Sequence, residues 1–153
     1  IKGTVFRQTQ FAEFELRMHE MAERGEPLTG DAFTKLYAQI VRDYYGHDKG
    51  VCVIDDLYTV EWAYVPHFYY NFYVYQYSTS FTAATALAEE TLGGSEDAAT
   101  RYLRLISAGG SDYPIAILKE AGVDMTTPGP FKKTMAVMNR TMGEIEAILA
   151  RRR

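Results

Sequence analysis

The chain has 153 residues, of which 47% are hydrophobic, 24% charged and 14% aromatic, which is the composition of a globular protein able to bury a sizeable core. The net charge of −4 provides no strong positive field, so we expect no nucleic-acid partner and no anionic membrane surface. No apolar run approaches the roughly 20 residues of a membrane-spanning helix.

Two amphipathic helices are predicted first. The opening IKGTVFRQTQF has no initiator methionine and no signal-peptide pattern, which suggests a piece of something longer. Between residues 5 and 24 apolar side chains recur at three- to five-residue steps, and Gly25 and Pro27 end this helix. Thr29 is the expected N-cap of the next helix, and Gly46 marks its end. The short connection predicts antiparallel neighbours.

The middle of the chain is predicted as a loop followed by a long helix. Residues 47–59 are glycine-containing and irregular, and their VCVI segment is too short to indicate a sheet. Pro66 suits a first helical turn, so we expect a helix from His67 to about Leu92. Aromatic residues occur all round this helix, which predicts that it is enclosed on most sides. One face of it carries His67, Tyr70, Val74 and Tyr77.

Three more helices are predicted in the C-terminal half. Ser95 begins the first, whose expected buried stripe consists of Tyr102, Leu103 and Ile106. Ser111 is the expected cap of a short helix that Gly122 closes. After the breaker TTPGP a last helix runs from Phe131 to about Ala150, and its apolar face consists of Met135, Met138, Met142, Ile145 and Leu149. The final Arg151–Arg153 complement its dipole.

The sequence therefore predicts an all-α fold of six or seven packed helices. No repeat, low-complexity region or long linker divides the chain. We expect a single helical domain or fragment over residues 1–153.

Most candidate reactive groups have simpler structural interpretations. The segment His19–Glu23, HEMAE, nearly matches the zinc motif HExxH, but a glutamate replaces the second histidine, so a solvated helix face is favoured. The only cysteine, Cys52, excludes an internal disulfide, favours a structural thiol and is compatible with a reducing, cytoplasmic location. The turn Gly109–Ser111 favours capping over anion binding. Asp55, Asp56 and Asp112 lack calcium-loop spacing.

The segment WAYVPHFYYNFYVYQY, residues 62–77, is the strongest functional signal. It holds the only tryptophan, His67 and six of the twelve tyrosines. Each buried tyrosine hydroxyl needs a hydrogen-bond partner. The pattern alone slightly favours a tyrosine-rich core. The alternative is a set of donors that face a cleft, where neutral hydroxyls suit an oxyanion formed during amide hydrolysis.

Four segments together resemble one family. They are TVFRQTQFAEFE (4–15), GEPLTGDAF (25–33), EWAYVPHFYYNFYVYQYSTS (61–80) and YLRLISAGGSDYPIAILKEAGVDM (102–125). They resemble the C-terminal part of oligoendopeptidase F-type zinc metallopeptidases, relatives of thimet oligopeptidase. The resemblance covers nearly the whole chain.

The resemblance implies hydrolysis of short peptides in a channel of an all-α protein. It also implies a zinc ion held by HExxH and a downstream glutamate, with the motif's glutamate activating water. These residues precede the matching region in the family and are absent from this sequence; HEMAE is not their equivalent. The resemblance thus implies that the intact protein is a zinc metalloendopeptidase. It also implies that this chain by itself is inactive and binds no zinc.

The resemblance also implies which residues contact substrate. His67 matches a family histidine that, with tyrosines, binds the peptide and stabilises the tetrahedral intermediate. The matching tyrosines are Tyr69, Tyr70, Tyr73 and Tyr75. Tyr75 and one of Tyr69 or Tyr70 are the favoured oxyanion donors, with His67 as the second catalytic residue.

A different class of function stays open. The chain could be a free-standing, non-catalytic helical module that binds peptides or a partner chain. A fragment also leaves apolar surface uncovered, so we expect self-association or packing against the missing N-terminal part.

Overall fold

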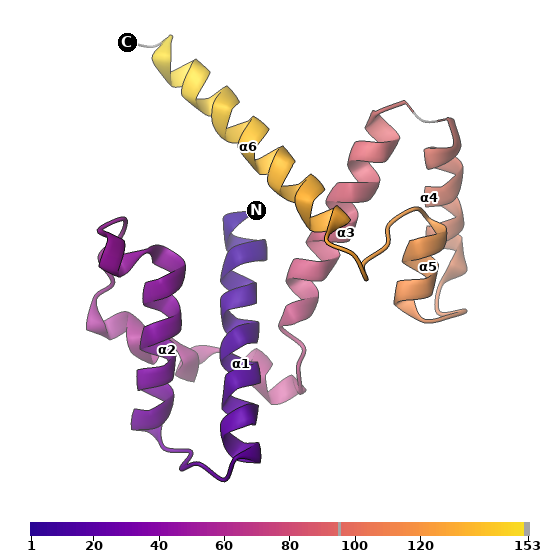
Figure 1. The fold of residues 1–153 in the computed structure, drawn as a ribbon. Coiled ribbons are helices and arrows are strands. Elements are labelled where there is room, and N and C mark those ends of the chain that lie inside the picture. The colour runs from indigo at the N-terminus through magenta and orange to yellow at the C-terminus, as the bar shows by residue number, and fades with distance from the viewer. Residues whose placement is uncertain (95, 152–153) are drawn as a thin grey trace. The chain divides into compact units, whose positions relative to one another are not determined.

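The computed structural model of this chain describes residues 1–94 and 96–151, and over those residues it contains helices and no strand (Figure 1). The predicted all-α fold is confirmed. The expected N-cap Ser95, and Arg152 and Arg153 of the terminal basic run, lie outside the described residues. The six α-helices are α1 (Arg7–Glu23), α2 (Gly30–Tyr45), α3 (Tyr75–Leu92), α4 (Glu96–Ala108), α5 (Pro114–Glu120) and α6 (Gly129–Ala150).

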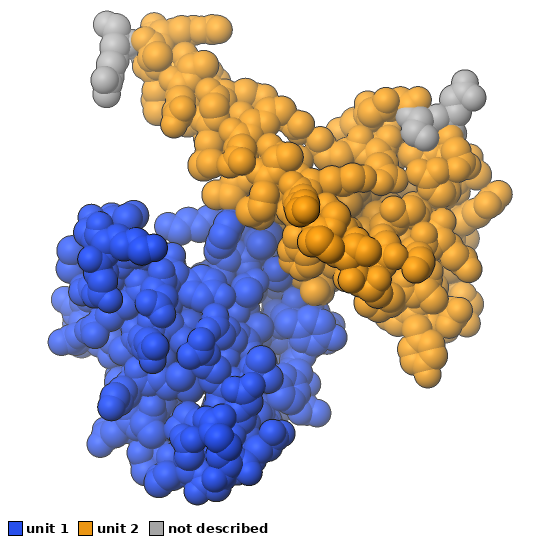
Figure 2. Space-filling view, in the orientation of Figure 1, with its two compact units in different colours: residues 1–78 blue, residues 79–153 orange. Residues whose placement is uncertain are grey.

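Four shorter helical segments complete the described part. The π-helical η1 (Lys2–Phe6) leads directly into α1. The 3-10 segments are η2 (His47–Lys49), η3 (Asp56–Tyr64) and η4 (Pro66–Tyr70). Two compact units divide the chain, Ile1–Ser78 and Thr79–Arg153 (Figure 2). The expectation of one domain over residues 1–153 stays a prediction.

The first unit is organised around the antiparallel pair α1 and α2, as predicted (Figure 1). Phe14 is fully buried, and its ring meets the ring of Tyr37 edge-on at 5.4 Å. Burial of one such side chain stabilises the fold by roughly 1.5–3 kcal/mol. The buried cluster consists of Phe11, Phe14, Tyr37, Ile40, Val41, Ile54 and Val74.

A polar chain of side chains crosses this core. Gln10 Nε2 donates to Tyr37 Oη at 2.8 Å, and Tyr37 Oη donates to Glu61 Oε2 at 2.6 Å. Glu61 also pairs with Arg7. Burial, followed by the hydrogen bond to Glu61, raises the pKa of Tyr37, so its hydroxyl stays a proton donor. These hydrogen bonds connect α1 and α2 to η3.

Both predicted ends of α2 are confirmed. The Thr29 hydroxyl accepts from Ala32 N at 3.2 Å, as an N-cap should. Gly46 ends the helix with a left-handed φ of 64°. The next residues, 47–59, contain η2 and the start of η3, and their VCVI segment forms no strand, as expected.

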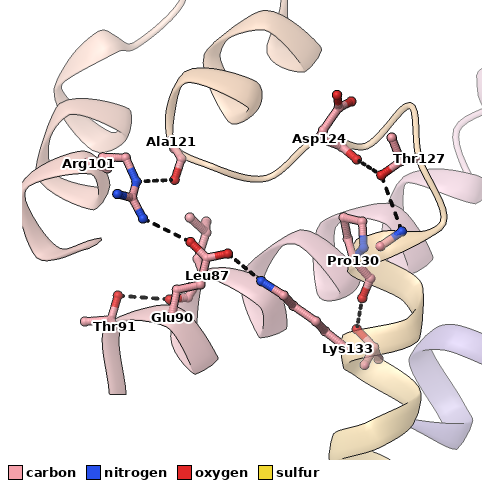
Figure 3. Close-up of polar contacts among 11 residues, drawn as sticks. Leu87, Glu90, Thr91, Arg101, Ala121, Asp124, Thr127, Pro130 and Lys133 are labelled. Carbon is pink, nitrogen blue, oxygen red and sulfur yellow. Dashed lines mark hydrogen bonds and ion pairs between the residues drawn. The ribbon is translucent and has the colours of Figure 1, made fainter. Parts of the chain in front are cut away.

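The second unit has its own small core and a charged centre. Ala83, Ala86, Leu87, Ala121 and Val123 form the buried cluster, in which the short alanine side chains allow α3 to pack closely. Glu90 of α3 accepts from Arg101 of α4 and from Lys133 of α6 (Figure 3). Arg101 Nε also donates to the Ala121 carbonyl at 3.2 Å. One carboxylate therefore connects three helices.

The predicted continuous helix from His67 to Leu92 is wrong. Pro66 does begin a helical segment, but η4 ends at Tyr70, and Asn71 and Phe72 adopt left-handed φ values of 49° and 59°. Asparagine tolerates this conformation, but a bulky residue such as Phe72 rarely adopts it, and no glycine marks the break in the sequence. The expected enclosure is also wrong, since Tyr69 is 89% exposed.

Three smaller expectations in the second unit are corrected. Tyr113, and not Ser111, occupies the N-cap position of α5, because the helix begins at Pro114. The stripe Tyr102, Leu103 and Ile106 of α4 is exposed, and so are Met142, Ile145 and Leu149 of α6. An apolar pattern indicates which face of a helix would be buried, but the surface that covers it comes from elsewhere.

Gly46 offers a test of this fold. We expect Gly46→Ala to lower the free energy of unfolding by about 1–2 kcal/mol through its left-handed backbone. It should cost more than Gly50→Ala, because a Cβ at position 46 would lie 3.1 Å from Val51 Cβ, whereas one at position 50, also left-handed, meets nothing within 4 Å. Urea denaturation of both variants measures the difference. Equal losses would show that the Val51 contact is immaterial.

Candidate functional site

The predicted aromatic segment gathers four rings on one part of the first unit. His67 and Tyr70 belong to η4, Tyr73 lies between the helices, and Tyr77 is in the first turn of α3. The break at Asn71 and Phe72 folds the segment back, so residues before and after it meet. We call His67, Tyr70, Tyr73 and Tyr77 the His/Tyr cluster.

His67 is the centre of the cluster. Its ring stacks on Tyr73 with centroids 5.9 Å apart and an interplanar angle of 12°. Tyr77 meets the same ring edge-on at 5.7 Å, and Tyr77 Oη lies 3.2 Å from His67 Nε2. The Tyr70 ring packs edge-on against two others, with its centroid 6.4 Å from that of His67 and 6.0 Å from that of Tyr73. Ring packing and one polar contact thus orient the imidazole.

The surroundings of the Tyr77 hydroxyl raise its pKa. A hydrogen bond with Tyr73 is the main cause that raises the pKa of Tyr77 above its ordinary value, and partial desolvation adds to it. Because an unperturbed tyrosine, with a pKa of about 10, is already neutral at physiological pH, the upward shift leaves Tyr77 a neutral hydrogen-bond donor. Neutral donors are the groups that stabilise a developing oxyanion without a change of their own charge.

The structure separates the predicted site residues into two sets. His67, Tyr70 and Tyr73 lie in the cluster. Tyr69 and Tyr75 are exposed, with 89% and 51% of their surface accessible to solvent. Their predicted roles in binding or catalysis stay predictions.

Sequence reasoning missed two residues of this region. Tyr77 was placed on the face of His67 but not selected as a site residue. Glu15, fully buried on α1, accepts a hydrogen bond from Phe72 N at 2.8 Å and so reaches the break in the segment. A glutamate among the apolar residues of an amphipathic helix is the signal that could have indicated Glu15.

The three histidines have separate local partners. His19 of the HEMAE segment lies against the Phe72 ring, with centroids 4.4 Å apart. Glu20 and Glu23 of the same segment are exposed, in agreement with the expected solvated face. His47 Nδ1 accepts from Ile54 N at 2.9 Å. Within residues 1–94 and 96–151 no three His, Cys, Asp or Glu side chains are grouped as metal ligands. The described donor set therefore does not fit a zinc site.

The remaining candidates have local roles. Asp55 caps η3 by accepting from Leu57 N at 2.9 Å, and Asp56 pairs with Arg42 at 2.9 Å. Cys52 is a free, exposed thiol. No helix in the described part of the chain has the length and apolar character needed to cross a membrane.

Comparisons with known proteins agree on one family. A model described as peptidase family M3 matches residues 2–137. The chain is 45% identical over 148 residues to oligopeptidase PepF of Bacillus subtilis, covering 97% of this chain and 22% of that protein. It is 42% identical over 152 residues to group B oligopeptidase PepB of Streptococcus agalactiae, covering 98% and 24%.

A solved structure has a similar fold. The crystal structure of oligoendopeptidase-F from Enterococcus faecium superimposes with a TM-score of 0.91 at 44% identity, covering 98% of this chain and 28% of that one. The chain therefore spans about a quarter of the length of these relatives.

The hydrogen bond between Tyr73 and Tyr77 predicts a titration shift. Tyr73→Phe should lower the pKa of Tyr77 towards the ordinary value of about 10, because the main cause of the increase is removed. NMR titration of ¹³Cζ-labelled tyrosine measures this pKa. Tyr113→Phe, at an 81% exposed position of the second unit, is the matched control and should leave Tyr77 unchanged. An unaltered Tyr77 in Tyr73→Phe would contradict the assignment.

Proposed function

Because this chain belongs to peptidase family M3, a family of zinc metallopeptidases, we propose that it contributes the substrate-binding and transition-state-stabilising wall of a zinc-dependent oligopeptidase. The wall consists of His67, Tyr69, Tyr70, Tyr73 and Tyr75. Its substrates are short peptides, by analogy with the oligopeptidases that the chain resembles.

The single observation that carries this proposal is the His/Tyr cluster. Only a partly exposed imidazole with hydroxyls around it can reach a peptide and still be held in one orientation. His67 is partly buried and fixed by ring contacts with Tyr73 and Tyr77, while Tyr70 is 64% exposed. A core of tyrosines would have buried its hydroxyls instead.

Each group has a distinct role in the proposal. Tyr75 and His67 lie at the reacting carbonyl and donate hydrogen bonds to the oxygen as its negative charge develops. Tyr69, Tyr70 and Tyr73 bind the peptide on either side. Tyr77 holds the His67 ring through the contact between its Oη and Nε2. Donors held in place before the reaction stabilise the transition state more than the substrate.

Zinc chemistry would have to come from outside the described residues. The family's metal polarises the scissile carbonyl and activates water when it is bound. The histidines of this chain are engaged separately, so we derive no step through the metal. By itself the chain is then a non-hydrolytic peptide-binding unit.

Apolar surface supports packing against further protein. Leu103 and Ile106 of α4 are each 59% exposed, and the α6 residues Met142, Ile145, Ile148 and Leu149 are exposed as well. We propose that another part of an M3 protein, or a second copy, covers these faces. A cytoplasmic location is part of the same proposal, since the exposed Cys52 thiol suits a reducing compartment.

The chain assayed with zinc should not hydrolyse a quenched fluorescent peptide, although it should bind that peptide. His67→Ala should weaken the binding, because it removes the centre of the cluster. Fluorescence measures turnover, and anisotropy measures binding. Robust turnover that a chelator abolishes would refute the proposal of an inactive unit. Absence of turnover together with unchanged binding in His67→Ala would instead favour a partner-binding module of another kind.

In a protein that has the full length of the M3 relatives, Tyr75→Phe should lower kcat more than it raises KM. The loss in kcat should be on the order of 10²-fold, as for removal of one oxyanion donor, because the hydroxyl acts mainly in the transition state. Steady-state kinetics measure both constants, with Tyr113→Phe as the control. An unchanged kcat would remove Tyr75 from the catalytic role.

A further inference from the structure

A buried glutamate of α1 contacts the break in the aromatic segment. Glu15 is 1% exposed and lies among the apolar residues of the first core. Its Oε1 accepts from the backbone N–H of Phe72 at 2.8 Å, across 57 positions of sequence. Burial of a carboxylate is unfavourable unless it is hydrogen-bonded, so this contact is a specific one.

The backbone at that point needs an external constraint. Asn71 and Phe72 have φ values of 49° and 59°. Asparagine tolerates this conformation, but a bulky residue such as Phe72 keeps it only when the surroundings hold it there. Two such residues in succession reverse the chain between η4 and α3. The Phe72 N–H lies inside this reversal and has Glu15 as its acceptor.

A second residue of α1 contacts the same residue. His19 lies four positions after Glu15, which places the two side chains on one face of the helix. The His19 ring lies 4.4 Å from the ring of Phe72, centroid to centroid. Glu15 thus contacts the Phe72 backbone while His19 contacts its side chain.

We propose that Glu15 and His19 clamp Phe72 and thereby position the His/Tyr cluster. His67 and Tyr70 precede the clamped residue, and Tyr73 and Tyr77 follow it. The stacking of His67 on Tyr73 therefore depends on the conformation at Phe72. Val74, which is fully buried, anchors the chain on the other side of Tyr73.

The clamp is a positioning device and touches no substrate. Its meaning for catalysis rests on the proposed function of the cluster, but its structural claim does not. HEMAE then has a role unrelated to its likeness to a zinc motif: His19 supports the backbone that carries His67.

The test uses the NMR signals of the His67 ring protons, which lie in the ring-current fields of Tyr73 and Tyr77. Glu15→Leu keeps a side chain of similar volume and removes the hydrogen-bond acceptor, so the His67 signals should move towards the values of an exposed histidine. Glu15→Gln retains a carbonyl oxygen that can accept from Phe72 N, and it should preserve the wild-type shifts. Phe72→Leu removes the ring contact with His19 but keeps the N–H that donates to Glu15, so it should shift the His19 ring signals and move the His67 signals less than Glu15→Leu does.

Ile40→Ala is the matched control for a merely structural role. Ile40 lies in the same core and is 2% exposed, so its truncation destabilises the unit without touching Phe72. The His67 signals should stay in place in this variant. Unchanged His67 signals in folded Glu15→Leu, or an equal movement in Ile40→Ala, would overturn the proposal.

Amide hydrogen exchange of the wild-type chain decides the matter if Glu15→Leu does not fold. The Phe72 amide should exchange more slowly than its exposed neighbour Asn71, because Glu15 accepts its hydrogen bond. Equally fast exchange would overturn the clamp. Peptide binding, measured in parallel, separates the two hypotheses: a wild-type chain that shows the clamp but binds no peptide would refute the proposed function alone.

Discussion

The buried face of α1 is the constraint on which the first unit depends. Phe11 and Phe14 supply the aromatic centre of the core, and Gln10 begins the polar chain to Tyr37 and Glu61. On the same helix Glu15 reaches Phe72. Because one rigid helix carries all these contacts, α1 is the frame that holds both the core and the aromatic segment in place.

Buried polar groups give this frame its specificity. An apolar core tolerates several arrangements of similar volume, whereas a buried carboxylate or amide is stable only beside particular partners. Glu15 and Tyr37 each have such partners from a distant part of the sequence. The aromatic segment is therefore placed by hydrogen bonds as well as by ring packing.

This arrangement explains how an exposed cluster keeps a defined geometry. Exposed side chains lose conformational entropy when they are ordered, so an orienting contact must offset that loss. His67 has a ring neighbour on two sides and a hydroxyl at Nε2. Tyr70 and Tyr75 remain open to solvent nearby. A surface of this kind suits the recognition of an extended peptide backbone by neutral donors.

The second unit is stabilised by other interactions than the first. Its core consists largely of alanine and valine side chains, and the carboxylate of Glu90 connects α3, α4 and α6. Such a unit leaves longer apolar side chains on α4 and α6 exposed. Those faces agree with a chain that spans about a quarter of its relatives' length.

Local chemistry was sufficient for the helical class and for several helix ends. The Thr29 cap and the left-handed Gly46 follow from residues within one turn of each other, so neither needs a distant partner. The aromatic composition also located the candidate site. The continuous helix expected from His67 failed at a break where Phe72 N–H donates to Glu15, 57 positions away, a contact that no local pattern records. Asparagine tolerates a left-handed φ, but left-handed Phe72 needs tertiary contacts, and these contacts decided which tyrosines meet His67.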